Sequence, residues 1–381
     1  MGQARLTHRI SAPPTANAVR RPGGVSVCRV SRGRGASRAL RRASAAGALL
    51  VVVGLAGCAI PRVQAAAPVP EPTPTYTSVF EPAPATQLAP LRGATVPLGS
   101  LAHASIAAKI DNHEEARPQY GLDRADIVFE ELVEGGLTRY VAVWQSNVPD
   151  LIGPVRSIRP MDPDIISPFG GIVAYSGGQE IFVDMMEDTV VYNAIHGNSD
   201  TDDTFYRTDE KESPHDVVVK APEVIGQHSD LAAPAQQFAY SYDVASSTAA
   251  KEGTPTSRID STFSGERYPH WQWDAGRSQY LRNQEGAPDY DSAGVQLGAT
   301  NLVVLRVGID WTYGYVPRTV MVGSGEAWVS TGGGTIHATW SKADRGAPIR
   351  LVDDRGVVVR LAPGNTWVEL IPDTGSVTLT P

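Results

Sequence analysis

Residues 106–164 read IAAKIDNHEEARPQYGLDRADIVFEELVEGGLTRYVAVWQSNVPDLIGPVRSIRPMDPD, and this stretch decides the fold. Its apolar runs alternate with turns, a pattern typical of β-sheet. Charged residues stand within or beside those runs, namely Asp111, Glu130, Glu134, Arg139, Arg156 and Arg159. Charged side chains are rarely buried unless they are paired. The stretch therefore holds either a structural ion-pair network or a ligand site, and the sequence leaves both open.

Two β runs in this stretch, at 126–134 and 138–146, flank Gly135-Gly136 and predict a hairpin. Alternation of side chains places Glu130 and Glu134 on one face of the first strand and Glu131 on the other. With a tight turn, Arg139 lies near Glu134 and can pair with it.

The segment at 153–160, GPVRSIRP, sets two arginines in stiff backbone between Gly-Pro and Arg-Pro. Arg156 and Arg159 can converge on one anion, because a guanidinium binds carboxylate or phosphate bidentately. Alternatively, they neutralise acids of the same stretch, such as Glu130 and Glu134. Both interpretations stay open, and both hold at once if the acids fix the arginines in place.

A further candidate is the sequence Ser213-Pro214-His215-Asp216. A histidine beside an acid suggests an oriented imidazole, which suits general acid–base chemistry. Such a neighbour pair also arises by chance, so a structural histidine is the alternative.

The first 57 residues contain ten arginines and no lysine or acidic residue. Arg41-Arg42 precede a short apolar run that ends at Cys58, the arrangement of a secretory signal. The run is shorter than the ~20 residues that span a membrane. Leu55-Ala56-Gly57-Cys58 has the form of a bacterial lipobox, so we expect acylated Cys58 to anchor the protein to the cell membrane. A short anchor helix with an incidental cysteine is the alternative, and the export route, Sec or twin-arginine, stays open.

Residues 58–100 are rich in Ala, Thr and Pro, with nine prolines between Pro61 and Pro97. Such a segment cannot bury enough apolar surface to offset the entropy of ordering it. We predict a disordered tether between lipidated Cys58 and an extracytoplasmic body.

The rest of the chain predicts an α+β fold in two parts. A mixed-sheet N-terminal domain occupies 101–242, a linker 243–260, and a mainly antiparallel β-rich C-terminal domain 261–381. Tryptophans gather in the C-terminal part, at Trp271, Trp273, Trp311, Trp328, Trp340 and Trp367. Aromatic residues are usually core, although a wall of them can also hold sugar rings.

Charge and cysteine content exclude several function classes. Without residues 1–57, Lys+Arg falls from 33 to 23 against 41 Asp+Glu, which leaves a charge of −18. Such acidity repels phosphate backbones, so we expect no nucleic-acid partner.

Cys28 and Cys58 both precede the folded region, which excludes a thiolate nucleophile, an internal disulfide and a cysteine-ligated zinc site from the body. We expect no cofactor and no metal.

Several motifs together resemble a known family: KIDNHEEARPQYGLDRADIVFEELVEGGLTRYVAVWQS, GPVRSIRP, FYR with SPHD, and the closing VGSG, TW and PGNTW. Across residues 100–381 they are similar to the YerB-like bacterial lipoproteins, a domain of unknown function (number 3048) with N- and C-terminal parts. The resemblance implies an envelope lipoprotein without an established activity. The chain departs from the family pattern at Asp216, where the family has Asn, and at Ser176, where a His often precedes the paired glycines.

The positions that match the family pattern are Asp111, Asn112, Arg117, Pro118, Gln119, Glu130, Glu134, Gly135, Arg139, Gly153, Arg156, Ser157, Arg159, Arg207 and His215. The resulting catalytic candidates are Glu130, Glu134, Asp111 and His215. The ligand-binding candidates are Arg156, Arg159, Arg139, Arg207 and Asn112.

Two functions of different classes follow. The first is an envelope binding protein whose partner is an anionic or glycan ligand of the cell wall, or another envelope protein. The alternative is a hydrolase of an envelope glycan or phosphodiester, with acid and base drawn from the four catalytic candidates. The chain has no GxSxG, HExxH or P-loop motif, which favours the first.

Overall fold

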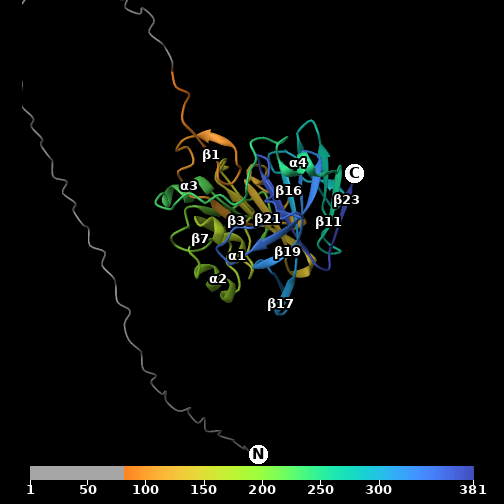
Figure 1. Ribbon diagram of the computed structural model, residues 1–381. Helices are drawn as coiled ribbons and strands as arrows, with labels where there is room; N and C mark the ends of the chain where they lie inside the picture. The colour runs from red at the N-terminus through yellow and green to blue at the C-terminus, as the bar shows by residue number, and fades with distance from the viewer. Residues whose placement is uncertain (1–80) are drawn as a thin grey trace, which may run out of the picture. The chain divides into compact units, whose positions relative to one another are not determined.

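A mixed sheet of eleven strands crosses the protein in the computed structural model (Figure 1). The structure describes residues 81–381; the predicted signal, Cys58 and most of the predicted tether lie outside the described residues. In order across the sheet, the strands are β10 (Thr254–Pro255), β20 (Gly334–Lys342), β19 (Gly323–Thr331), β16 (Asn301–Val307), β22 (Thr366–Pro372), β4 (Ile127–Leu132), β5 (Thr138–Trp144), β3 (Ile106–Asp111), β6 (Ile172–Tyr175) and β7 (Tyr192–Ile195). The remaining strand, β21 (Arg350–Asp353), pairs with β20.

A second, six-stranded sheet is antiparallel throughout. Its strands are β14 (Ala287–Pro288), β13 (Gln279–Gln284), β12 (His270–Asp274), β11 (Arg258–Thr262) and β23 (Ser376–Thr380), with β15 (Gly298–Ala299) paired to β13. Three two-stranded sheets complete the set: β1 (Thr86–Leu88) with β2 (Thr95–Pro97), β8 (Phe205–Arg207) with β9 (Val217–Val219), and β17 (Ile309–Tyr313) with β18 (Val316–Thr319).

The helices are few and short. The α-helices are α1 (Asp162–Ile166), α2 (Glu180–Glu187), α3 (Ala221–Gln227) and α4 (Thr248–Glu252). The 3₁₀ turns are η1 (Glu114–Ala116), η2 (Leu122–Arg124), η3 (Glu134–Gly136) and η4 (Ser167–Phe169). None of the helices within residues 81–381 is long and apolar enough to cross a membrane. The prediction of an α+β fold, with a mixed sheet and a mainly antiparallel C-terminal part, is confirmed.

Strands from both predicted parts of the chain belong to the large sheet. The junction is β22, which pairs in parallel with β4 on one side and with β16 on the other. Parallel neighbours of this kind are usually covered on both faces. The strands β3, β4 and β5 are accordingly buried along their whole length.

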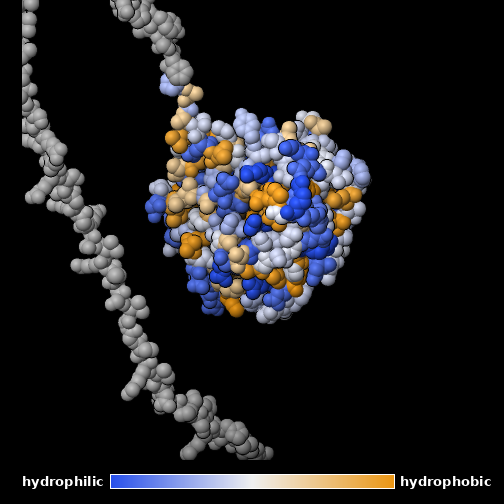
Figure 2. Space-filling view, viewed as in Figure 1, coloured by the Kyte–Doolittle hydropathy of each residue, from blue (hydrophilic) through white to orange (hydrophobic). Residues whose placement is uncertain are grey.

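Each face of the large sheet contributes to its own hydrophobic core. Alternate residues such as Ala107 and Val141 pack with Ile165 of α1 and Phe182 of α2. The intervening residues, such as Tyr140, pack with Trp271 of the six-stranded sheet. The protein therefore has three layers, with α1 and α2 on one face of the large sheet and the second sheet, together with α3, on the other. On the side seen in Figure 2, hydrophobic patches are scattered among hydrophilic residues.

The predicted tether extends too far into the described residues. Strands β1 and β2 form an ordered hairpin, and Ala89 and Leu91 between them are buried. Tyr240 donates its hydroxyl to Leu91 O at 2.6 Å, and the Arg92 guanidinium lies 3.2 Å from Asp126 Oδ1. The prolines at this end of the tether therefore occur in structured chain, because later parts of the sequence supply partners that the local composition does not reveal.

The carboxyl ends of β3, β4, β6 and β22 lie along one edge of the large sheet. β4 is parallel to β22 and β3 is parallel to β6. β5 is antiparallel to both β3 and β4, so β3 and β4 also share a direction. Ligand sites of open parallel sheets usually form outside such carboxyl ends. Asp111 ends β3, Glu134 follows β4 and Arg139 lies at the start of the antiparallel β5, which brings these predicted site residues to this edge.

Candidate functional site

Asp111 ends β3 and is the carboxylate around which the site is built. Its Oδ2 lies 2.6 Å from Nδ1 of His215 and 3.1 Å from Nε of Arg156, while Oδ1 accepts from the backbone N–H of His113 at 3.2 Å. Asp111 and His215 are both almost fully buried, with 4% and 6% exposure. Water and salt therefore screen their interaction only weakly.

The GPVRSIRP segment is fixed by backbone hydrogen bonds between β3 and β9. The N–H of Val155 donates to Val217 O at 2.7 Å, and the N–H of Arg156 donates to Lys109 O at 2.8 Å. The segment thus continues the sheet hydrogen bonding at the carboxyl end of β3. This pairing places the Arg156 side chain beside Asp111.

An open pocket of about 290 Å³ lies against this edge. The predicted site residues that line it are Asp111, Glu134, Arg139, Arg156, Arg159 and His215. Three guanidinium groups therefore face two carboxylates, and arginine remains protonated at neutral pH. Without counting the histidines, the three arginines and two carboxylates give the lining of the pocket a net positive charge.

Arg139 is the buried arginine of the pocket. It lies on β5 opposite Asp111 of β3 and Glu131 of β4, and its exposure is 8%. Nη1 donates to Ser157 O at 2.9 Å, and within residues 81–381 no carboxylate oxygen lies within 4.0 Å of this guanidinium. Burial, with a smaller contribution from the charge of Arg159, lowers the pKa of Arg139 to about 10. The Arg139 guanidinium therefore stays charged at neutral pH, and the nearby carboxylates compensate its charge only in part.

Arg159 is paired internally. Its Nε lies 2.9 Å from Glu134 Oε2, and its Nη1 donates to Ser157 O at 3.2 Å and to Ile158 O at 3.0 Å. Burial disfavours the ionised form of Glu134, but the hydrogen bond and charge of Arg159 outweigh burial and hold the pKa of Glu134 below its ordinary value. This pair neutralises one arginine and leaves Arg139 as the less compensated charge.

Glu130 and Asn112, two predicted site residues, lie on the other face of the sheet. Glu130 is fully buried and binds Arg282 at 2.5 Å and the Thr138 hydroxyl at 2.7 Å. Burial raises its pKa, against the charge of Arg282. Asn112 donates to Thr138 Oγ1 at 2.8 Å and accepts from Arg117 Nε at 3.0 Å. Their polar groups are therefore used inside the protein.

The predicted common face of Glu130 and Glu134 is wrong. β4 ends at Leu132, and Glu134 begins the turn η3, in which Gly135 and Gly136 have φ of 71° and 74°. The strand alternation therefore stops before Glu134, and the left-handed Gly135 and Gly136 that follow it complete the turn toward β5. Glu134 therefore joins the pocket near Arg139, while Glu130 faces the six-stranded sheet.

Arg207 is not among the residues that line the pocket. It is half-exposed and pairs with Asp216 at 2.6 Å. Asp216 was predicted to orient the imidazole of the neighbouring His215. The imidazole is instead held by Asp111, because sequence neighbours at the start of β9 point in different directions.

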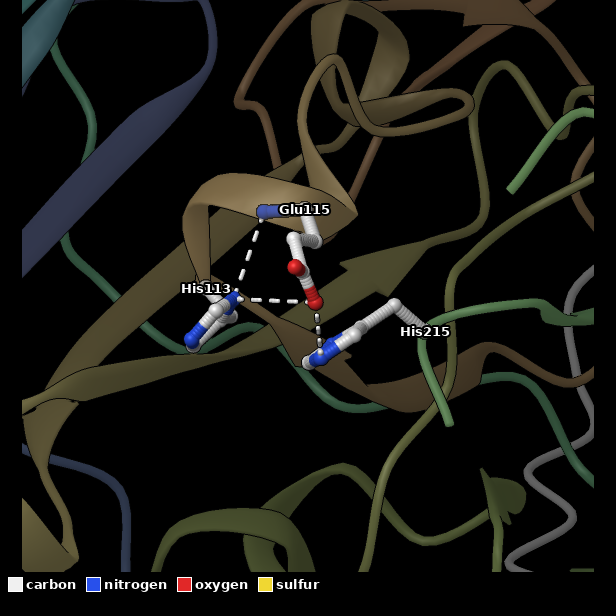
Figure 3. A group of neighbouring side chains, drawn as sticks. All are labelled: His113, Glu115 and His215. Atoms are coloured by element: carbon white, nitrogen blue, oxygen red, sulfur yellow. Dashed lines mark hydrogen bonds and ion pairs between the residues drawn. The ribbon is translucent and has the colours of Figure 1, made fainter. Parts of the chain in front are cut away.

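Four further residues belong to the site and were not predicted: His113, Glu115, Thr138 and Tyr315. His113 stacks on His215 with ring centroids 4.5 Å apart, and Glu115 Oε2 lies 3.3 Å from His215 Nε2 (Figure 3). His113 follows β3 within the Asp-Asn-His motif, which is a signal that the sequence did offer. Tyr315 comes from the connection between β17 and β18, far along the chain, and no local pattern marks it.

A second groove of about 550 Å³ adjoins the arginine pocket. The two share Val133, Glu134 and Tyr315, and the groove adds Trp311. Trp311 is 56% exposed and Tyr315 75% exposed. An aromatic surface therefore continues directly from the charged pocket.

Comparisons with known proteins agree with this architecture. Residues 93–235 match "Protein of unknown function (DUF3048) N-terminal domain", and residues 259–368 match the corresponding C-terminal domain. The chain is 27% identical over 307 residues to the protein named "Putative lipoprotein YerB" of Bacillus subtilis (strain 168), covering 75% of this chain and 86% of that protein. The crystal structure of YerB from Bacillus subtilis superposes with a TM-score of 0.66 at 22% identity, covering 77% of this chain and 99% of that chain, and so shares the fold. The chain belongs to the DUF3048 family of proteins of unknown function.

Proposed function

We propose that this protein is a lipid-anchored protein of the bacterial cell envelope that binds an anionic glycan in the pocket of Arg139, Arg156 and Arg159. The anion, a phosphate or carboxylate group, would occupy the arginine pocket. A sugar ring would extend along the groove of Trp311 and Tyr315.

The single observation that carries this proposal is the state of Arg139. Its guanidinium is buried, lines an open pocket and has no carboxylate within 4.0 Å among residues 81–381. A buried charge that is incompletely compensated is costly. An anion that enters from outside would offset that cost and gain charge-assisted hydrogen bonds.

Arg156 adds a second donor at the same place. Its Nη1 donates to Pro214 O at 2.8 Å and its Nε lies 3.1 Å from Asp111 Oδ2. These contacts fix the guanidinium before any ligand arrives. A donor that is already ordered loses less side-chain entropy on binding.

The glycan part of the proposal rests on the adjoining groove. Exposed aromatic rings offer an apolar face to a ligand, and sugar rings pack on such faces. Tyr315 lines both the groove and the arginine pocket, so one ligand can reach both. A glycan that carries a charged group has both features.

The proposed location at the cell membrane rests on the N-terminal signal sequence and on a related protein. Cys58 follows an apolar run in a lipobox pattern, and a related protein is named as a putative lipoprotein. Acyl chains on Cys58 would hold the body at the outer side of the cell membrane, within reach of wall polymers. The absence of a nucleic-acid partner remains a prediction from the acidic body.

The alternative of a hydrolase remains a prediction with weaker support. Glu130 is fully buried and bound to Arg282, so it lacks the access to substrate that a catalytic carboxylate needs. Glu134 is committed to Arg159, and Asp111 to Arg156 and His215. These contacts suit binding better than proton transfer.

Isothermal titration of the detergent-solubilised full chain tests the proposed function. The probes are N-acetylglucosamine 1-phosphate, inorganic phosphate and neutral N-acetylglucosamine. We expect the sugar phosphate to bind most tightly and the neutral sugar most weakly. The double variant Arg156→Ala/Arg159→Ala should weaken the sugar phosphate by at least ~10-fold, since each charge-assisted hydrogen bond contributes ~1.5–3 kcal/mol. Equal binding of charged and neutral sugars, or unchanged binding by a folded double variant, would contradict the proposal.

A further inference from the structure

His113, Glu115 and His215 form a compact group at the rim of the arginine pocket (Figure 3). His113 and Glu115 follow β3, and His215 precedes β9. One donor atom from each residue lies within 4.8 Å of the other two. We propose that these three side chains bind one divalent transition-metal ion of the zinc class. The proposal does not depend on the anion pocket.

The donor set determines the class of ion. Two imidazoles and one carboxylate are ligands that Zn²⁺ accepts while leaving a fourth position open. Imidazole nitrogen also suits neighbouring transition metals, whereas Mg²⁺ and Ca²⁺ prefer oxygen. Residues 81–381 contain no cysteine, so histidine supplies the only strong donors here.

The hydrogen bond behind His215 is the second observation that points to a metal. Nδ1 lies 2.6 Å from Asp111 Oδ2, and a carboxylate can only accept, so Nδ1 carries a proton. In the neutral ring this leaves the Nε2 lone pair free, and Nε2 is the nitrogen that faces Glu115 Oε2 at 3.3 Å. Metal-bound histidines almost always have such a carboxylate or carbonyl on their other nitrogen.

Asp111 is itself held in place. Arg156 Nε lies 3.1 Å from its Oδ2, and the N–H of His113 donates to its Oδ1 at 3.2 Å. This support fixes the imidazole plane of His215 independently of any ion. Asp111 is therefore a positioning residue for the proposed site.

Closing the site requires a small movement. Ligand atoms around a tetrahedral Zn²⁺ lie about 3.3 Å apart, given Zn–N and Zn–O bonds of about 2.0–2.2 Å. His113 Nδ1 and Glu115 Oε2 are 4.0 Å apart. The Glu115 side chain is 65% exposed and free to rotate inward. Nδ1 of His113 would give up one hydrogen bond, which it accepts from the Glu115 N–H at 3.2 Å.

The competing interpretation is a protonated His215 held between two carboxylates without a metal. The chain contains a matched example of that arrangement. His337 has Asp354 at 2.6 Å from Nδ1 and Glu326 at 3.2 Å from Nε2, and these three do not form a metal-sized group with a second imidazole. His337 therefore serves as the control.

The test uses the untagged, detergent-solubilised full chain after removal of metals with EDTA. Titration with Co²⁺ should produce the visible absorption of a four- or five-coordinate ion at one ion per chain, and Zn²⁺ should displace it. His113→Ala and His215→Ala should each weaken binding at least ~10-fold, and Asp111→Asn ~10–100-fold through the ring that it orients. His337→Ala should bind like the wild type.

No saturable Co²⁺ or Zn²⁺ binding would overturn the proposal, as would wild-type affinity in His113→Ala or an equal loss in His337→Ala. Circular dichroism reports whether each variant is folded. Should His215→Ala fail to fold, the partly exposed His113 and Glu115 carry the test through His113→Ala and Glu115→Gln. Sugar phosphate binding is measured separately on the metal-free chain, so a failure of the metal site leaves the anion pocket tested on its own.

Discussion

Arg282 of β13 and Glu130 of β4 form an ion pair with an N–O distance of 2.5 Å, although 152 residues separate them. Both side chains are fully buried. The guanidinium also lies 5.3–5.6 Å from the ring centroids of Tyr140, Trp271 and Trp367. The pair joins the six-stranded sheet to the large sheet and explains why Glu130 is a structural residue.

Loss of Arg282 should destabilise the protein strongly. Arg282→Met would leave Glu130 and Asp289 buried without their common cation. Removing one partner of a buried pair typically costs ~3–5 kcal/mol. Urea denaturation measures the change. The control is Arg258→Met, which removes an exposed pair with Asp260 and should cost less than ~1 kcal/mol. A loss below ~1 kcal/mol in Arg282→Met would show that the pair does not stabilise the junction.

Glu369 makes stability depend on pH. Burial, followed by the charge of Glu130, raises the pKa of Glu369 to about 8. The folded state therefore keeps a proton that the unfolded state releases above its ordinary value of 4.5, so stability falls as pH rises from 4.5 to about 8. Glu369→Gln keeps the group neutral and can still accept from the Trp271 indole.

The variant Glu369→Gln should therefore match the wild type near pH 5 and exceed it by roughly 1–3 kcal/mol at pH 8.5. Urea denaturation at several pH values gives both curves. Glu223→Gln, on the surface beside Lys220, should follow the wild type at every pH. A constant difference across the range would mean that Glu369 is ionised throughout.

Cys58 should carry the membrane anchor. Mass spectrometry of the mature N-terminus is expected to find acyl chains on Cys58, and Cys58→Ala should release the protein from the membrane fraction. Cys28→Ala, in the predicted leader, should leave the mature protein anchored. An unmodified Cys58 in the mature chain would rule out the lipid anchor.

Trp311 should distinguish a glycan from a simple anion. Trp311→Ala removes the exposed ring of the groove and should weaken N-acetylglucosamine 1-phosphate by about 3- to 10-fold, the scale of one aromatic contact. Inorganic phosphate should bind as before, because it does not reach the groove. Equal effects on both ligands, measured by titration, would argue against a sugar in the groove.

Much of the fold could be predicted from local patterns. The strands at 127–132 and 138–144 lie within the predicted runs at 126–134 and 138–146, because alternation and paired glycines mark them. The pairing of β22 with β4 could not be predicted, since nothing local identifies a partner more than 200 residues away. The β1–β2 hairpin was missed because residues from later in the chain, such as Tyr240, contact it.

The site was predicted in part. Arg139, Arg156 and Arg159 line one pocket while Arg207 lies outside it, because Arg139 lies at the start of β5 at this edge and the segment of Arg156 pairs with the end of β3. Glu130 lies outside the pocket because its partner Arg282 comes from a distant strand, and Glu134 leaves the face of Glu130 because β4 ends at Leu132. The Asp-Asn-His motif marked the position of His113, but its stack with His215 depends on the fold.

Arg139 provides the most direct test of the anion pocket. The measurement is the affinity of the full chain for N-acetylglucosamine 1-phosphate in wild type, Arg139→Lys and Arg139→Gln, with Arg207→Gln as a control outside the pocket. The account predicts a loss of at least ~10-fold in Arg139→Gln, a smaller loss in Arg139→Lys, which keeps the charge, and no change in Arg207→Gln. Wild-type affinity in a folded Arg139→Gln variant would contradict it.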